Sequence, residues 1–168
     1  MASTYINRIV WLVVLVLMQV LVFDNLLLWG VVHPLLYVYL ILKFSTGTDR
    51  CETMLWAFAL GLIIDIFEDS LGANAAALTL AAFARPTLLR LFVTRDAQDD
   101  DVAMPSIKAF GLPAFFKYVL TFVLLHHAAA AILIQFSFDN IGSLLLRIIG
   151  CTAMTVACVF AIEVIRKK

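Results

Sequence analysis

The chain has 168 residues, of which 64% are hydrophobic and 14% are charged, whereas soluble proteins are about 45–50% apolar and about 25% charged. Its 12 basic and 12 acidic residues give a formal net charge of zero. This composition excludes a disordered chain, a basic nucleic-acid-binding protein and an ordinary soluble enzyme. We therefore expect an all-α, polytopic membrane protein with one domain over residues 1–168.

Six apolar segments predict six transmembrane helices, arranged as three hairpins. A helix needs about 20 apolar residues to cross the hydrocarbon core, and most of the segments reach or approach that length. The third is the shortest, so a re-entrant or buried half-helix is the alternative at that position. The predicted spans are residues 9–23, 26–42, 54–67, 71–92, 118–138 and 141–165.

The basic residues decide between these alternatives and predict the orientation. With six crossings and a cytoplasmic N-terminus, ten Lys and Arg residues face the cytoplasm and none lies in an outer turn. They are Arg8, Lys43, Arg50, Arg90, Arg95, Lys108, Lys117, Arg166, Lys167 and Lys168. If the third segment failed to cross, the seven basic residues that follow it would lie outside and only three would remain inside, against the positive-inside rule. We therefore expect six spans with both termini in the cytoplasm, and an uncleaved first span.

The connections between the predicted spans differ in length. The outer turns are short, and their Asp, Asn and Ser residues are suitable N-caps for the helices that follow. The longest inner loop, residues 94–113, carries an acidic run that is either a solvated connector or a docking point for a cytoplasmic partner. Because almost no chain projects outside the membrane, any function there must run through the spans or through a partner.

Ionisable side chains within a span are costly in lipid and mark functional sites or structural pairs. Asp65 and Arg147 both fall in the outer half, where they can form an ion pair or reach the outer interface separately. Arg85 precedes Pro86, so it can satisfy a carbonyl freed by the proline or reach the cytoplasmic interface. Glu163 has basic residues at i+3 and i+4, which predicts an ordinary helical pairing.

Two further spans carry polar residues that favour contacts within the bundle. His126 and His127 lie near the middle of the fifth span, and adjacent helical residues point about 100° apart, so they do not easily share a metal. Hydrogen bonding is the favoured role for them, with a proton relay as the alternative. In the fourth span, Asn74 is a candidate for an interhelical hydrogen bond, and an alanine run that includes Ala76 permits close helix approach.

Sequence signatures of catalysis and metal binding are absent. The chain has no zinc-protease, nucleophile-elbow or phosphate-loop motif. It also has no C-x-x-C pair, and its three cysteines are interpreted as packing residues rather than disulfide partners. We therefore expect a protein that is not an enzyme and that uses no cofactor or metal.

One stretch of the chain resembles a known family. Gly61 and Asp65 lie late in the third span, a short outer turn follows, and Gly72 and Asn74 open an alanine-rich fourth span that ends in Arg85. This pattern, together with the chain length, the six-span topology and the nearly absent outer loops, resembles the MreD family of rod shape-determining proteins. The pattern covers about 25 residues, and the topology covers the whole chain.

The resemblance implies a six-helix bundle like that of transporter S components, in the inner membrane of a bacterium. It also implies a non-catalytic subunit of the cell-elongation machinery, which controls cell shape and peptidoglycan synthesis through contacts with MreC. The wider implied complex contains the actin-like MreB, the glycosyltransferase RodA and a class-B penicillin-binding transpeptidase, together with membrane lipid. The residues expected to serve structure or partner contact are Asp65, Gly72, Asn74, Ala76, Arg85 and Arg147.

The main alternative is the substrate-binding S component of an energy-coupling-factor vitamin transporter, which has a similar size and six helices. S components dock on their transporter through small residues of the first span, and residues 9–23 contain no Ala or Gly. A secondary transporter would need helices broken by Gly or Pro in matching halves, and these are not evident. The sequence therefore favours the non-transporting subunit.

Overall fold

The regular structure of the chain is helical throughout the residues that the computed structural model describes, which are 2–23, 34–93, 104–135 and 141–166. Within these residues, four helical stretches are long and apolar enough to cross a membrane. They are Tyr5–Phe23, Ala73–Phe92, Leu112–Gln135 and Ile141–Arg166. The protein is thus all-α, and these helices indicate a membrane-associated protein.

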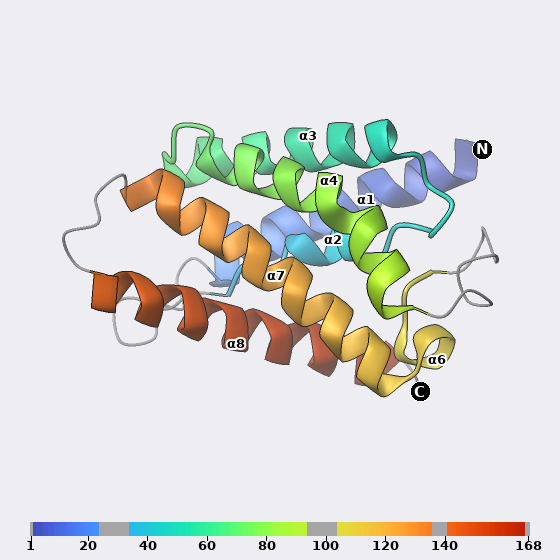
Figure 1. Cartoon of the computed structure of the whole chain (residues 1–168). Coiled ribbons are helices and arrows are strands. Elements are labelled where there is room, and N and C mark those ends of the chain that lie inside the picture. Colours follow the sequence, from blue (N-terminus) through green and yellow to red (C-terminus); the bar gives the residue numbers. More distant parts are fainter. Residues whose placement is uncertain (1, 24–33, 94–103, 136–140, 167–168) are drawn as a thin grey trace.

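Two antiparallel helix pairs form most of the bundle (Figure 1). The pairs are α3 (Arg50–Glu68) with α4 (Ala73–Phe92), and α7 (Leu112–Gln135) with α8 (Ile141–Arg166). The two pairs meet where α4 packs against α7. Both termini lie at one end of the bundle, and the short α3–α4 connection lies at the other, which we call the turn end.

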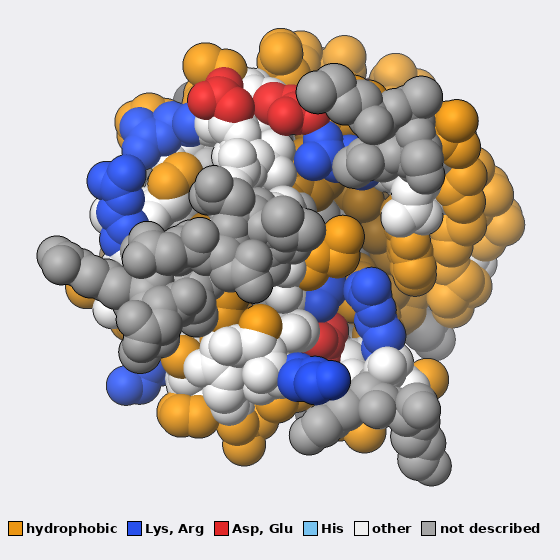
Figure 2. Space-filling model, turned by 90° about the vertical axis from the view of Figure 1, so that its right-hand side faces the viewer, with side chains coloured by type: hydrophobic (Ala, Val, Ile, Leu, Met, Phe, Trp, Pro, Cys, Tyr) orange, Lys and Arg blue, Asp and Glu red, His pale blue; other side chains and the backbone are white. Residues whose placement is uncertain are grey.

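Basic side chains gather at the end that holds both termini, which we call the basic end (Figure 2). Seven of the ten basic residues predicted to face the cytoplasm are described and lie in elements at this end. They are Arg8, Lys43, Arg50, Arg90, Lys108, Lys117 and Arg166. Arg95, Lys167 and Lys168 lie outside the described residues, as does the acidic run of the longest predicted loop.

The first helix lies along the bundle with most of its apolar surface exposed. It comprises α1 (Ala2–Met18) and a π-helical turn, η1 (Gln19–Phe23). Leu15, Val16 and Gln19 are buried, whereas large side chains such as Ile6, Val10 and Leu17 are exposed. In a membrane this surface would contact lipid or another transmembrane helix.

The segment predicted as one helix over residues 26–42 has a different structure where it is described. Its first residues, up to 33, lie outside the described part; Pro34 to Tyr37 are not helical, and α2 (Val38–Leu42) is only five residues long. Proline has no N–H to donate, and the N–H groups of Leu35 and Leu36 bond to side chains instead of to backbone carbonyls. The prediction of a regular helix is therefore wrong for residues 34–37.

Side chains from distant helices replace the missing helical hydrogen bonds of this unwound segment. The N–H of Leu36 donates to Gln19 Oε1 (2.8 Å), and the Gln19 amide donates back to the carbonyl of Pro34 (3.1 Å). The N–H of Leu35 donates to Thr155 Oγ1 on α8 (3.0 Å). An unsatisfied backbone group in a membrane costs several kcal/mol, and irregular backbone is tolerated there only when buried in protein. These bonds allow the chain to unwind inside the bundle.

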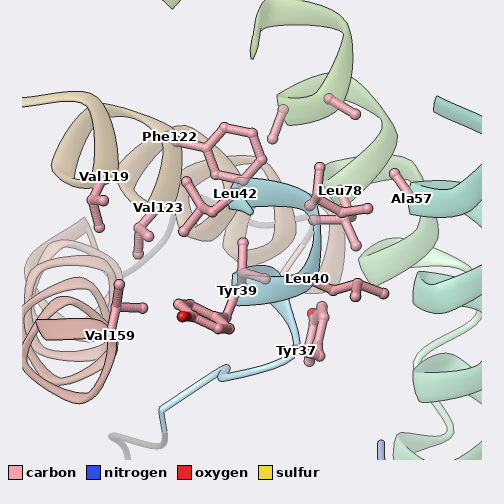
Figure 3. Packing of buried hydrophobic residues seen from close by; sticks show 14 of the residues in the cluster. Tyr37, Tyr39, Leu40, Leu42, Ala57, Leu78, Val119, Phe122, Val123 and Val159 are labelled. Atoms are coloured by element: carbon pink, nitrogen blue, oxygen red, sulfur yellow. The ribbon is translucent and has the colours of Figure 1, made fainter. Parts of the chain in front are cut away.

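The unwound segment and α2 occupy the centre of the hydrophobic core (Figure 3). Tyr37, Val38 and Ile41 are completely buried. Around the α2 segment lie side chains from α3, α4, α7 and α8, including Ala57, Leu78, Val119, Phe122, Val123 and Val159. The predicted second span therefore contributes to the packing of the whole bundle.

The remaining predicted spans correspond to helices with shifted boundaries. The shortest, residues 54–67, belongs to the continuous 19-residue helix α3, which is about 28 Å long at 1.5 Å per residue. The helix begins four residues before the predicted span, because its first turn is polar and is capped by Asp49, which accepts from the N–H of Cys51 (3.1 Å). Of the described helices, α3 is not among the four that are long and apolar enough to cross a membrane. The short helix α6 (Ile107–Phe110) precedes α7, which begins at Leu112 rather than at residue 118.

Candidate functional site

The two helices of the α3–α4 pair approach each other closely at Gly61. A Cβ atom at this position would lie 2.7 Å from the backbone nitrogen of Ala75, and closer still to its Cα. Small residues of this kind let helix backbones come together in membranes. This close approach explains why position 61, which belongs to the family-like pattern, is a glycine.

Asp65 caps the start of the helix that follows it. Its Oδ1 accepts from the N–H of Asn74 (2.9 Å) and from the Ser70 hydroxyl, and its Oδ2 accepts from the N–H of Ala75 (2.9 Å). Gly72 occupies the N-cap position of α4 and has no side chain that could do this. A carboxylate at a helix N-terminus satisfies orphan N–H groups and interacts favourably with the helix dipole. Asp65 therefore stabilises the turn between two helices.

The turn itself contains left-handed backbone conformations. Asp69, Leu71 and Gly72 have φ angles of 53°, 50° and 85°. Gly72 adopts this conformation without a steric penalty, whereas Leu71 does not. The Leu71 side chain is also fully exposed. The predicted importance of Gly72 thus has a conformational basis.

Arg147 does not pair with Asp65. The ion pairs within the described residues join Arg8 to Glu52 and Lys43 to Glu163. Both Asp65 oxygens instead face N–H or O–H donors of the α3–α4 turn. The Asp65–Arg147 ion pair, one of the two alternatives that the sequence left open, is therefore not formed.

Arg147 instead lines a cavity at the turn end, which we call the turn-end cavity. Its volume is about 370 Å³, and its polar lining combines acidic groups, a guanidinium, an imidazole and an amide, contributed by Glu68, Asp69, Asn74, His127 and Arg147. Apolar walls come from α7 and α8, and Leu35 of the unwound segment also lines it. The size lies within the usual range for small-molecule sites, about 300–1,000 Å³. The arrangement can hold a small molecule that carries both charges.

A chain of buried hydrogen bonds joins this cavity to the middle of the bundle. Asn74 donates to Glu68 Oε2 (2.7 Å) and accepts from the Tyr37 hydroxyl (3.1 Å). His126 Nε2 lies 3.2 Å from the same hydroxyl, and His127 Nε2 lies 3.0 Å from Thr155 Oγ1. The two histidines thus bond to different elements, as expected for hydrogen bonding within the bundle.

Arg85 is buried near the basic end, with only 1% of its surface exposed. Its guanidinium donates to the carbonyl of Phe44, to the carbonyl of Ser45 (3.4 Å) and to the Tyr118 hydroxyl (3.1 Å). Among the described residues, its partners do not include a carbonyl freed by Pro86, and its burial means that it does not extend to the cytoplasmic interface. Both roles suggested by the sequence are therefore wrong. Arg85 instead ties α4 to the chain just after α2.

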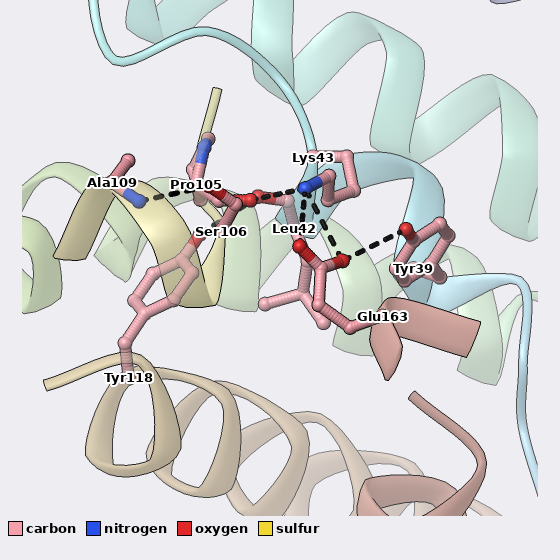
Figure 4. A network of polar contacts seen from close by, with 8 residues as sticks. All are labelled: Tyr39, Leu42, Lys43, Pro105, Ser106, Ala109, Tyr118 and Glu163. Atoms are coloured by element: carbon pink, nitrogen blue, oxygen red, sulfur yellow. Dashed lines mark hydrogen bonds and ion pairs between the residues drawn. The ribbon is translucent and has the colours of Figure 1, made fainter. Parts of the chain in front are cut away.

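A second buried polar group, formed by Lys43, Glu163 and Tyr39, lies nearby (Figure 4). Lys43 Nζ lies 3.3 Å from Glu163 Oε1 and also donates to the carbonyl of Pro105. The Tyr39 hydroxyl donates to Glu163 Oε2 (3.2 Å). Burial lowers the pKa of the Lys43 ammonium, and the Glu163 carboxylate partly opposes that shift.

The expected pairing of Glu163 with residues one turn later is replaced by this group. Lys167 lies outside the described residues, and Arg166 forms no ion pair within them. Glu163 is 6% exposed and bonds to the α2 segment instead. The contact joins two parts of the chain that are more than 100 residues apart, so helical spacing could not indicate it.

The alanine run at the start of α4 is divided between the inside and the outside of the bundle. Ala73, Ala75 and Ala77 are buried, whereas Ala76 is exposed. Buried alanines allow α4 to approach α3 and α7, and they are not available to a partner. Ala76 alone of this run points away from the bundle.

Metal-ligating side chains do not cluster within the part of the chain that the structure describes. Its cysteines, Cys51, Cys151 and Cys158, are all free thiols. Comparisons with protein-family models, with curated proteins and with solved structures find no significant match to this chain.

Proposed function

We propose that this chain is a non-catalytic, inner-membrane scaffold subunit of the MreD type, which binds a transmembrane helix of MreC and so links it to the cell-elongation machinery. The observation that carries the proposal is the construction of the α3–α4 hairpin. Three residues of the pattern that resembles the family, Gly61, Asp65 and Gly72, build this hairpin, and Ala76 is left on its outward face.

The outward face of α4 has properties that suit helix association. In lipid, helices associate through close packing of small residues and through interhelical hydrogen bonds, since lipid tails remove the usual hydrophobic driving force. Ala76 provides a small exposed position, and Leu80 and Phe83 are exposed one and two turns further along α4. A partner helix could therefore approach at Ala76 and pack along the larger side chains.

The composition of the first helix favours a scaffold function rather than that of a transporter subunit. Its exposed surface consists of large side chains such as Ile9, Val13 and Leu17. These offer a wide apolar surface to lipid or to a partner helix. They lack the small residues through which S components are expected to dock.

Co-purification of MreC from a mild detergent tests the proposal. Ala76→Leu should reduce MreC recovery at least about tenfold, since a bulky side chain at the closest approach separates the helices. Ala157→Leu is the matched control, because Ala157 is also exposed but lies on α8. Both variants should melt at the temperature of the unaltered protein. Equal MreC recovery with both would contradict a contact at Ala76, and no recovery with the unaltered chain would contradict the scaffold function.

The turn-end cavity favours a second candidate function, that of a substrate-binding S component. A volume of about 370 Å³ lined by both acidic and basic groups suits a small zwitterionic solute. A thermal-shift screen of the purified protein with water-soluble vitamins tests this candidate. A vitamin that stabilises the unaltered chain but not an Arg147→Gln variant, with no MreC recovered, would replace the scaffold proposal.

A further inference from the structure

Two cavities adjoin each other at the basic end of the bundle. The larger has a volume of about 290 Å³, the smaller about 110 Å³, and both are lined by Lys43, Met104 and Arg166. The larger also contacts Lys108 of α6, and the smaller contacts Trp11 of α1. We call them together the basic-end cavities.

The charges around these cavities are unequal. The Glu163 carboxylate forms an ion pair with Lys43 and accepts a hydrogen bond from Tyr39, and Glu52 forms an ion pair with Arg8. Within the described residues, neither Lys108 nor Arg166 forms an ion pair. Among the described residues that line the larger cavity, three are basic (Lys43, Lys108 and Arg166) and one, Glu163, is acidic, so its rim carries an excess of positive charge.

The walls of the cavities are amphipathic. Ile107 and Met104 line the larger one beside Lys108, and Trp11, Leu15 and Leu40 line the smaller one beside Arg8. Trp residues favour the membrane interface, where one face is apolar and the other is wet. A free anion would use only the basic part of this lining, whereas an amphiphile would use both parts.

We propose that the basic-end cavities bind the head group of an anionic phospholipid. Its phosphate is held by Lys108 and Arg166, and its glycerol and first acyl carbons lie against the apolar walls next to Met104 and Trp11. Basic pockets between transmembrane helices are suited to such head groups, and each basic residue near an anionic surface strengthens the attraction. This site is independent of the turn-end cavity and of any protein partner.

Native mass spectrometry of the full chain in mild detergent tests the proposal, with phosphatidylglycerol as the probe and phosphatidylethanolamine as the zwitterionic comparison. The unaltered protein should retain phosphatidylglycerol in preference to phosphatidylethanolamine. The double variant Lys108→Gln/Arg166→Gln should bind it about 30-fold more weakly, which corresponds to about 2 kcal/mol. Both side chains are exposed, so the double variant should melt without lipid at the temperature of the unaltered protein.

The matched control is Arg90→Gln/Lys117→Gln. These two residues are also basic, exposed and at the same end, but they line neither cavity. An equal loss of binding in the control would show diffuse charge attraction and overturn the site. Equal retention of both lipids, or displacement of phosphatidylglycerol by millimolar inorganic phosphate, would also overturn it, the latter in favour of a free-anion site.

Discussion

The turn end and the basic end of the bundle use buried charges of opposite sign for the same purpose. At the turn end, the Asp65 carboxylate accepts from the N–H groups that begin α4. At the basic end, the Arg85 guanidinium donates to the carbonyls that follow α2. The first turn of a helix leaves N–H groups without partners, which attract negative charge. Carbonyls of the chain just beyond a helix also need donors when they are buried, and a guanidinium supplies them. An ionisable residue inside a membrane bundle can therefore satisfy backbone groups rather than form an ion pair or a reaction centre.

The largest effect should come from breaking the basic end with Arg85→Met. The substitution removes the guanidinium donor from the buried Phe44 carbonyl and from the buried Tyr118 hydroxyl, whereas the Ser45 carbonyl keeps the N–H of Thr48 as a donor (3.1 Å). We expect the free energy of unfolding to fall by about 4 kcal/mol, measured by denaturant unfolding in detergent micelles. Arg85→Lys should recover only part of the loss, because an ammonium cannot reach three acceptors in the same fork geometry. If Arg85→Met were as stable as the unaltered protein, the Arg85 hydrogen bonds would not stabilise the basic end.

The next largest effect should come from forcing the α3–α4 pair apart with Gly61→Ala. The added Cβ would collide with the Ala75 backbone, which cannot move without shifting α4. We expect a loss of about 3 kcal/mol in the free energy of unfolding. Ala59→Leu adds more volume on the exposed side of the same helix and serves as the control. Comparable losses in the two variants would mean that crowding at Ala75 is not the cause.

Removing the carboxylate that caps α4, with Asp65→Ala, should cost about 2 kcal/mol, since two buried N–H groups lose their acceptor. Asp65→Asn retains one oxygen and should cost about half as much. Hydrogen exchange at the first turn of α4 measures the local effect, and denaturant unfolding measures the global one. The control is Asp69→Asn, which neutralises an exposed acid in the same turn. If Asp69→Asn were as costly as Asp65→Asn, net charge rather than capping would explain the loss.

The smallest effect should be the coupling between Asp65 and Arg147. A double-mutant cycle with Asp65→Asn and Arg147→Gln should give an interaction free energy below about 0.5 kcal/mol, because the two groups share no contact. Unfolding of the four proteins in the same detergent provides the measurement. A coupling above about 1 kcal/mol would indicate an ion pair between Asp65 and Arg147. The buried charge at the turn end would then act differently from Arg85 at the basic end.

Much of the fold could be predicted from sequence because long apolar runs and charge placement are local signals. The helices α1, α4, α7 and α8 overlap their predicted spans, and the seven described residues among those predicted to face the cytoplasm lie at the end that holds both termini. The orientation in the membrane and the number of crossings remain predictions. The predicted ends were less accurate where a polar first turn, as in α3, belongs to the helix.

The unwound segment shows where local signals fail. Residues 34–42 are nearly all apolar, so a regular helix and an unwound segment have the same hydropathy. Pro34 is a local indication of a break, but it does not show how far the break extends. The groups that make the break possible, Gln19 and Thr155, are respectively 15 and 120 residues away along the chain from the residues that they bind.

The sequence by itself determined that the chain is apolar and all-α, where its long helices lie, and that Gly61, Asp65 and Gly72 belong to one short pattern. Only the tertiary structure decided what each buried charge binds. Asp65, Arg85 and Glu163 bind groups that are 5 to 124 residues away, on other helices or at their ends. Hydropathy depends on side chains alone, whereas these partners are determined by which backbone groups remain unsatisfied after the helices pack.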